Sequence, residues 1–329
     1  MTVLRPSGNP PRAQVVRLVV GCAIAAVALV VVLRGTDLHQ LWLALRTLQA
    51  EWLAIALGSI AMSLAASAMR WRLTFFPDHA RIGWGPLFNA LLIGQMLNIV
   101  LPLRTGEIGR AYVLSASRRI PVGKVLSTIA IERLSDLAAA GTVALLLIAA
   151  GAGPDWLAGP GRALVAGGML AVGTAVVLTV AAPRIARFIT RVGSAIAPRF
   201  RPRLEAAVQP AVEGLAGLRN VPVALSIWML AMVVTALAAS TNYFLFRAFE
   251  FPLAPVAALV LLVALQIGNS LVSVPGNLGV FHAITVLVLT RFGVEREPAI
   301  AYSLVLYAVA IVPKILLGAA CLSMTKRHR

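Results

Sequence analysis

The stretch Asn98–Arg110 reads NIVLPLRTGEIGR, and it interrupts an apolar run that begins near Ile82. A proline, two glycines and three charged residues stand there, where a membrane helix would continue. Irregular backbone at membrane depth is tolerated only where it is buried in protein or lines a water-filled cavity, because unpaired amides are costly in lipid. The stretch therefore predicts a broken or re-entrant helix beside a polar cavity.

The composition around this stretch is that of a polytopic membrane protein. Of the 329 residues 60% are hydrophobic and 12% are charged, and the mean hydropathy is +0.89. These values lie far outside the range of soluble domains. The net charge of +17 would suggest nucleic acid in a soluble protein. Here the basic residues gather in a few loops, as the positive-inside rule and anionic lipids produce, so we expect no nucleic-acid partner.

Cysteine and histidine usage gives no sign of a metal site. Cys22 and Cys321 fall in apolar segments near opposite ends of the chain, and the four histidines are scattered without ligand spacing. A disulfide framework and a zinc site both need regular spacings. We therefore expect neither a metal nor another cofactor.

Apolar runs long enough to cross a membrane, roughly 20 residues, recur along the chain. The candidates are 17–33, 52–69, 82–102, 125–150, 161–182, 221–246, 252–274, 279–293 and 298–322. Not all of them can cross, and the first is read as an uncleaved signal anchor. The predicted fold is all-α, with about six to eight transmembrane helices and two broken or re-entrant elements.

Lysines and arginines beside the spans set the predicted orientation in a cell (inner or plasma) membrane, with both termini cytoplasmic. If 82–102 crossed fully, the basic loop 104–124 would lie outside. The simpler prediction is that 82–102 dips into the bilayer and returns. Segment 252–293 is either a dip from the external side or two tight crossings, and both leave the C-terminus cytoplasmic.

This topology divides the chain into a tail, a membrane domain and a second tail. The predicted ranges are 1–16, 17–325 and 326–329, and a basic cytoplasmic connector at 183–220 joins two halves of the membrane domain. The connector mixes arginines with apolar residues at helical spacing. It is either a helix on the lipid headgroups or a solvated linker, and its prolines exclude one continuous helix.

A second interrupted element, LQIGNSLVSVPGNLGVFHA, begins at Leu265. Each element holds a glutamine three residues before an asparagine, followed by a proline and two glycines. Interrupted segments at corresponding positions of two halves point to an inverted repeat with a central site. The alternative is local similarity alone. The predicted backbone breaks are at Pro102, Gly106, Gly109, Pro275, Gly276 and Gly279.

The first break has the side chains for a phosphate site. Arg104 and Arg110 can bind a phosphate oxygen through bidentate hydrogen bonds, and Asn98 stands close to them in sequence. Glu107 lies three residues from each arginine, where it would pair with one of them or compete with the ligand. The alternative is an ordinary cytoplasmic loop that is basic because of topology.

A third group of polar residues enters the span at 125–150. Glu132, Arg133 and Asp136 share one broad face of a helix that is otherwise apolar. Ionisable groups inside a span usually face a cavity or each other. They are predicted to line a polar cavity or to form a structural ion-pair cluster, and Asn269 and His282 are added as polar candidates near the second break.

These motifs, in this order, resemble the lysylphosphatidylglycerol synthase transmembrane region family, also called the flippase-like domain. The resemblance covers about residues 15 to 325. The family's pattern falls on Asn98, Pro102, Arg104, Gly106, Glu107, Arg110, Glu132, Arg133, Asp136, Pro275, Gly276 and Gly279. Many members carry a glutamate soon after that last glycine, where this chain has His282, so a proton-coupled carboxylate is not expected there.

The resemblance implies a function in moving lipids. In multiple peptide resistance factors, this type of domain moves an aminoacylated anionic lipid between leaflets and precedes an aminoacyl transferase domain. We expect this chain to be a stand-alone member without the transferase. The expected function is translocation or binding of an anionic or phosphate-bearing lipid.

Two other function classes stay open. One is a non-transporting accessory subunit of a lipid, hopanoid or cell-wall glycan biosynthetic enzyme, which would be a partner besides membrane lipids. The other is a membrane-embedded lipid enzyme, for which the sequence offers no nucleophile motif, metal set or P-loop. We therefore expect a protein that is not an enzyme.

Overall fold

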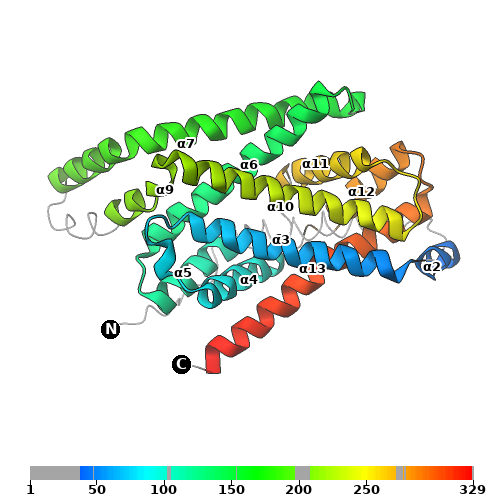
Figure 1. The fold of residues 1–329 in the computed structure, drawn as a ribbon, viewed down its shortest axis with the longest axis horizontal. Coiled ribbons are helices and arrows are strands. Elements are labelled where there is room, and N and C mark those ends of the chain that lie inside the picture. The colour runs from blue at the N-terminus through cyan, green and yellow to red at the C-terminus, as the bar shows by residue number, and fades with distance from the viewer. Residues whose placement is uncertain are drawn as a thin grey trace.

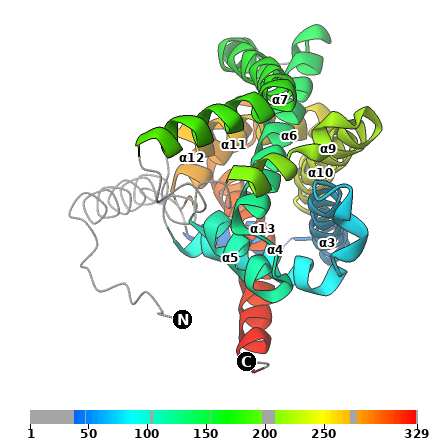
Figure 2. The same ribbon diagram turned by 90° about the vertical axis from the view of Figure 1, so that its left-hand side faces the viewer.

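The computed structural model describes residues 38–46, 48–101, 105–152, 154–196, 208–271, 277 and 279–327. Every regular element within these ranges is a helix, as predicted. The candidate span 17–33, the N-terminal tail 1–16, and Pro102, Arg104, Pro275 and Gly276 lie outside the described residues. Figures 1 and 2 show a bundle in which α3 (Ala50–Leu73) and α10 (Val221–Ala248) run side by side.

Four helices in the described part of the chain are long and apolar enough to cross a membrane. They are Ala50–Leu73 in α3, Asp155–Leu178 in α7, Val221–Ala248 in α10, and Arg296–Met324 in α13. A helix of 24 residues spans about 36 Å, which exceeds a hydrocarbon core of about 30 Å. The chain is thus a multi-pass membrane protein, and the count of six to eight spans stays a prediction.

Helix α6 (Val122–Ala149) has 28 residues and is as long as α10, but it carries Glu132, Arg133 and Asp136. It packs along α7 (Asp155–Ile196), which lies at one edge of the bundle, and it runs from that edge across the bundle toward α5 (Gly106–Arg118; Figure 1). Length alone would let α6 cross a membrane. These three charged residues form ion pairs with residues of other helices and with each other, as described below.

The first broken element is a helical hairpin. Helix α4 (Trp84–Val100) and helix α5 (Gly106–Arg118) pack against each other and are joined at 101–105. Gly106 and Gly109 therefore lie inside α5 and not in the break. Gly106 permits close packing instead, because a Cβ atom there would stand 2.2 Å from the carbonyl oxygen of Gly94.

The second broken element is also a hairpin, formed by α11 (Pro255–Leu271) and α12 (Val280–Arg291). Gly279 immediately precedes α12 with φ 80° and ψ −58°. These values are those of a classic γ-turn, which strains residues that have a Cβ atom. This glycine does belong to the break, as predicted from the sequence.

The predicted boundary at residue 183 is not a helix boundary. Helix α7 runs for 42 residues without interruption, through Pro183 and to Ile196. Its last turns carry exposed Ile185, Phe188 and Ile189. The first part of the predicted connector thus continues a membrane helix, since proline is tolerated inside such helices where other groups satisfy the freed carbonyl. Residues 208–213 are helical, and α9 follows at Ala216–Arg219.

The two largest hydrophobic clusters among the described residues hold the bundle. The larger one joins α10 to α13, α11 and α12, around Phe246 and Tyr302. The smaller one contains Trp71, Phe75 and Leu114 and packs the first hairpin against α3 and α6. The smaller cluster lies directly beside the charged residues of α6, and it fixes their partners.

Two short elements and the last long helix complete the described fold. Helix α2 (Leu38–Arg46) precedes α3, and a 3-10 turn, η1 (Asp78–Arg81), links α3 to α4. Helix α13 (Arg296–Arg327) contains Pro313 and packs on α4 and α12.

Candidate functional site

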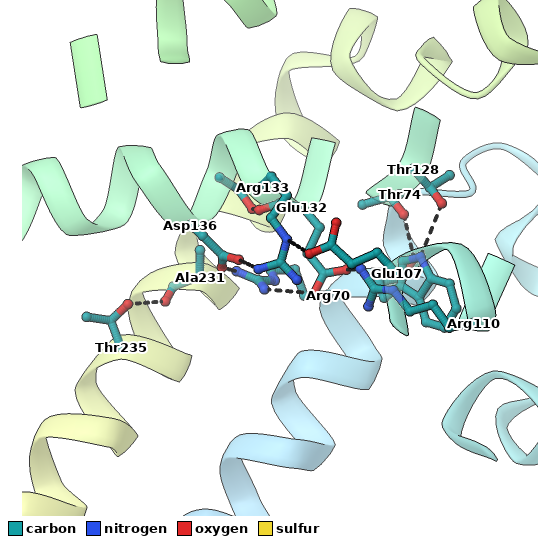
Figure 3. A network of polar contacts seen from close by, with 12 residues as sticks. Arg70, Thr74, Glu107, Arg110, Thr128, Glu132, Arg133, Asp136, Ala231 and Thr235 are labelled. Atoms are coloured by element: carbon teal, nitrogen blue, oxygen red, sulfur yellow. Dashed lines mark hydrogen bonds and ion pairs between the residues drawn. The ribbon is translucent and has the colours of Figure 1, made fainter. Parts of the chain in front are cut away.

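Glu132 stands at the centre of a buried group of charges (Figure 3). Its Oε2 atom accepts from Nη2 of Arg110 at 2.7 Å, and its Oε1 atom accepts from Nη2 of Arg70 at 3.3 Å. The three side chains are only 3 to 5% exposed. Each carboxylate oxygen thus has its own guanidinium partner, so the buried negative charge is fully compensated.

The same pattern continues on both sides of Glu132. Arg70 also donates to Asp136, and Arg133 pairs with Asp136 at 3.0 Å and with Glu107 at 2.7 Å. The order Glu107, Arg133, Asp136, Arg70, Glu132, Arg110 alternates in sign along five ion pairs. We call these six residues the ion-pair chain, and its formal charges sum to zero.

Helix geometry explains why these residues meet. Glu132 and Asp136 are four apart on α6 and Glu107 and Arg110 are three apart on α5, so each pair shares one helix face. Helix α5 packs against α4 and beside α6. Arg70 comes from the last turn of α3. The ion-pair chain therefore ties the first hairpin to two long helices.

Neighbouring residues hold Arg110 in place. Its guanidinium lies 4.7 Å from the ring centroid of Trp71, a cation–π contact. The indole Nε1 of Trp71 donates to Oγ1 of Thr128 at 3.1 Å. Gly94 leaves room for the side chain, because a Cβ atom there would stand 2.7 Å from Cβ of Arg110. Arg110 is thus enclosed on three sides.

One face of the ion-pair chain opens into a cavity of about 500 Å³. The charged residues Arg70, Glu107, Glu132, Arg133 and Asp136 contact one another and form its polar end. Apolar side chains, serines, amides and one lysine line the rest. The further lining residues are Ile60, Ser63, Leu64, Ser67, Gln95, Asn98, Ile99, Leu101, Val234, Ala238, Asn277, Phe281, Ala310, Ile311 and Lys314.

Lys314 is a cavity residue that the sequence analysis missed. It stands within the apolar helix α13, one turn before Gly318. A lone lysine in a long apolar span is a signal in itself, since such residues usually mark a functional site. Arg70 was also missed as a site residue, because its place at the end of α3 is where the positive-inside rule puts arginines in any case.

The predicted site residues separate into distinct positions. Asn98 and Glu107 line the cavity, as do the three charged residues of α6. Arg110 is buried behind them and is not among the described lining residues, so its role as a phosphate ligand stays a prediction. Arg104 and the side chain of Asn269 lie outside the described residues.

His282 lies away from the cavity. It is buried against α13, with Nδ1 3.1 Å from Oγ of Ser303 and its ring 5.0 Å from that of Tyr307. The Ser303 hydroxyl itself donates to the carbonyl of Ile300. The Nδ1 atom is therefore best assigned as the donor, which makes His282 a helix-packing residue in this arrangement.

No three histidine, cysteine, aspartate or glutamate side chains gather as metal ligands within the ranges that the structure describes. The carboxylates of the ion-pair chain are instead compensated by arginines.

Comparison with known proteins supports the resemblance drawn from the sequence. The family model described as Lysylphosphatidylglycerol synthase TM region matches residues 18–318. A curated protein, Glycosyltransferase AglD of Haloferax volcanii, is 40% identical over 77 residues. That stretch is 22% of this chain and 12% of the relative, so the chain spans only a small part of that protein's length.

Proposed function

The chain belongs to the lysylphosphatidylglycerol synthase transmembrane region family, and from this membership and the geometry of the cavity we propose that it binds a phosphate-bearing lipid and moves it between leaflets. The observation that carries the proposal is the amphipathic lining of the central cavity. The lining combines charged and amide side chains with apolar ones, which suits a lipid headgroup and the start of its acyl chains.

The cavity runs along one face of α3. Ile60, Ser63, Leu64 and Ser67 follow each other at spacings of three and four, and Arg70 ends the row. At about 1.5 Å per residue this face is roughly 15 Å long. A headgroup at Arg70 would place the first acyl carbons beside Ile60 and Leu64.

The ion-pair chain supports a moving part as well as a binding site. It joins the α4–α5 hairpin to α3 and α6 through side chains alone, and such pairs can exchange partners without breaking a helix. Because every charge in the ion-pair chain has an opposite neighbour, a phosphate that pairs with one of its arginines must displace a carboxylate, which then needs another partner. We propose that this exchange couples headgroup binding to movement of the hairpin.

The orientation is part of the proposal. With both termini cytoplasmic in a cell membrane, the last turn of α3 and the first turns of α6 face the cytoplasm, and the polar end of the cavity lies near that side. Single cysteines placed at 120 and at 184 would be labelled from the same side as the C-terminus. External labelling of either position would overturn this orientation.

The test of transport is leaflet exchange of fluorescent phosphatidylglycerol in proteoliposomes, with and without a proton gradient. Ser63→Trp fills the cavity from α3, whereas Ala65→Trp adds the same side chain at an exposed position of the same helix. We expect exchange in the wild type and in Ala65→Trp, and at least tenfold slower exchange in Ser63→Trp. Equal exchange rates in the two variants would mean that the lipid does not pass through this cavity.

The local similarity to a glycosyltransferase favours one second candidate, a non-transporting subunit of a lipid or glycan biosynthetic enzyme. This candidate predicts lipid binding without leaflet exchange, and a biosynthetic enzyme that copurifies in stoichiometric amount. Exchange by the purified chain alone would exclude it.

A further inference from the structure

Lys314 differs from the arginines of the ion-pair chain, because it has no carboxylate partner among the described residues. All three arginines of the ion-pair chain face carboxylates at ion-pair distance. Within the described part of the chain, no carboxylate lies that close to Lys314. Lys314 therefore adds one positive charge to the neutral ion-pair chain, and this charge lies on α13.

The packing of α13 places this charge near the break of the first hairpin. Sγ of Cys321 contacts Oδ1 of Asn89 at 3.3 Å, and a Cβ atom on Gly318 would meet the Leu92 carbonyl oxygen at 2.7 Å. As numbers fall on α13 they rise on α4, so the two helices are antiparallel. The next turn of α13 carries Lys314 toward the Gln95–Asn98 end of α4, and all three residues line the cavity.

The two amides at that end need hydrogen-bond donors. Oε1 of Gln95 and Oδ1 of Asn98 are buried, and neither accepts a hydrogen bond. A buried carbonyl oxygen without a donor is costly, and native proteins rarely leave one so. Water in the cavity or a ligand with hydroxyl groups would satisfy both. These two residues and Lys314 come from different helices, so their meeting depends on the fold.

Taken together, we infer that the cavity selects a lipid with a single negative phosphodiester and a hydroxylated headgroup, with Lys314 binding the phosphate and Gln95 and Asn98 accepting from the hydroxyls. This inference rests on the proposed function and names its substrate class. A glycerol or sugar attached to the phosphate meets both conditions. An ammonium headgroup can donate hydrogen bonds to the two amide oxygens, but its positive charge is repelled by that of Lys314.

Short-chain lipids in solution separate these features. The probes are dihexanoyl phosphatidylglycerol, phosphatidylmethanol, which has the same charge and no hydroxyl group, and phosphatidylethanolamine, which adds an ammonium group. Each is titrated calorimetrically into the full chain in a polyoxyethylene detergent, because the sugar heads of maltoside detergents would compete for the amides. The wild type is expected to prefer phosphatidylglycerol to phosphatidylmethanol by about 5- to 50-fold, from two hydrogen bonds.

Variants assign each part of the preference. Lys314→Met should weaken phosphatidylglycerol binding by about 10- to 100-fold, as for loss of a charged hydrogen bond, and Lys314→Arg should retain most of it. Lys124→Met is the matched control, since it removes one lysine outside the cavity. Gln95→Leu and Asn98→Leu should each reduce the preference for phosphatidylglycerol and leave phosphatidylmethanol binding unchanged.

The outcomes distinguish the two proposals. If Lys314→Met binds phosphatidylglycerol as tightly as the wild type, the assignment of Lys314 is wrong and the proposed lipid site stands. If the wild type binds phosphatidylglycerol and phosphatidylmethanol equally, selection of hydroxyl groups is wrong. If the wild type binds none of the three lipids, the proposed function itself fails.

Discussion

The two hairpins of this protein look alike in sequence and have different chemistry. Both are pairs of short helices, and the first helix of each pair carries a glutamine three residues before an asparagine near its end. The first hairpin sends Glu107 and Arg110 into the ion-pair chain. The second sends His282 to a serine on α13 and packs its other side chains into the larger hydrophobic cluster.

This difference shows that an interrupted apolar helix predicts the shape of the backbone, a hairpin, but does not predict which side chains that hairpin brings to a site. Both breaks reach the cavity, the first through Gln95, Asn98 and Glu107 and the second through Asn277 and Phe281. Among these five residues only Glu107, from the first hairpin, is charged. The four predictions below test this asymmetry, in order of expected effect.

The largest effect is expected for Glu132→Gln, which leaves Arg70 and Arg110 buried without their shared carboxylate. Removing one partner of a buried pair costs about 3–5 kcal/mol. Unfolding in mixed micelles would measure the loss. Glu107→Gln is the matched control, because Glu107 is 20% exposed and has one partner. Equal losses in the two variants would contradict the central role of Glu132.

Gly106→Ala is expected to destabilise the first hairpin by about 1–3 kcal/mol through overpacking. The added methyl group would meet backbone, the carbonyl oxygen of Gly94 at 2.2 Å, which cannot move aside. Gly109→Ala serves as control in the same helix. There the methyl group meets only the Cδ1 atom of Leu97 at 2.7 Å, the end of a flexible side chain. The comparison fails if Gly109→Ala costs as much as Gly106→Ala.

His282→Leu in the second hairpin is expected to cost about 1 kcal/mol, the loss of one buried hydrogen bond to Ser303. Ser303 keeps its own bond to the carbonyl of Ile300, so no donor is left unpaired. Leaflet exchange should continue at the wild-type rate because His282 is not among the described cavity residues. If a folded His282→Leu variant lost leaflet exchange, the second hairpin would also be required for transport.

The smallest effect concerns the ion pair between Asp78 and Lys124, which lies outside the membrane helices. Nζ of Lys124 donates to Asp78 at 2.7 Å, and this hydrogen bond, with the lysine charge, lowers the pKa of the aspartate below its ordinary value near 3.9. A lowered pKa in the folded state stabilises above the unfolded pKa, and the gain is lost as pH falls through the folded pKa.

The expected contribution of this pair is about 0–1 kcal/mol at neutral pH, because it is partly exposed and screened by salt. Unfolding measured from pH 6 down to pH 3 should lose this amount below about pH 4. Asp78→Asn should remove that part of the pH dependence. A pH profile identical to that of the wild type would mean that the pair contributes nothing.

Much of the fold follows from hydropathy and breaker residues. The predicted runs 52–69, 221–246 and 298–322 each fall within a long helix, and the two interrupted elements are the two hairpins. The family resemblance is confirmed over residues 18–318. The boundary at residue 183 was placed where the apolar run gives way to arginines, but α7 continues as one helix to Ile196.

The candidate site was less accessible from the sequence. Glu107 and the three charged residues of α6 were identified because charges in apolar helices are costly and need a reason. The full set of ion pairs was not identified from the sequence. Arg133 lies beside Glu132 in sequence, but in the structure it pairs with Glu107 and Asp136. Arg70 and Lys314 belong to helices far from α6 in the chain, and only packing brings them to the cavity.

The sequence by itself determined that this chain is a helical membrane protein, where its helices are interrupted, and which family it belongs to. These properties depend on local hydrophobicity, backbone-breaking residues and ordered motifs, which are read along the chain. The tertiary structure decided which charged residues form ion pairs with each other. An ion pair acts over a few ångströms between helices distant in sequence, so the balance of the ion-pair chain and the added charge of Lys314 exist only in the packed bundle.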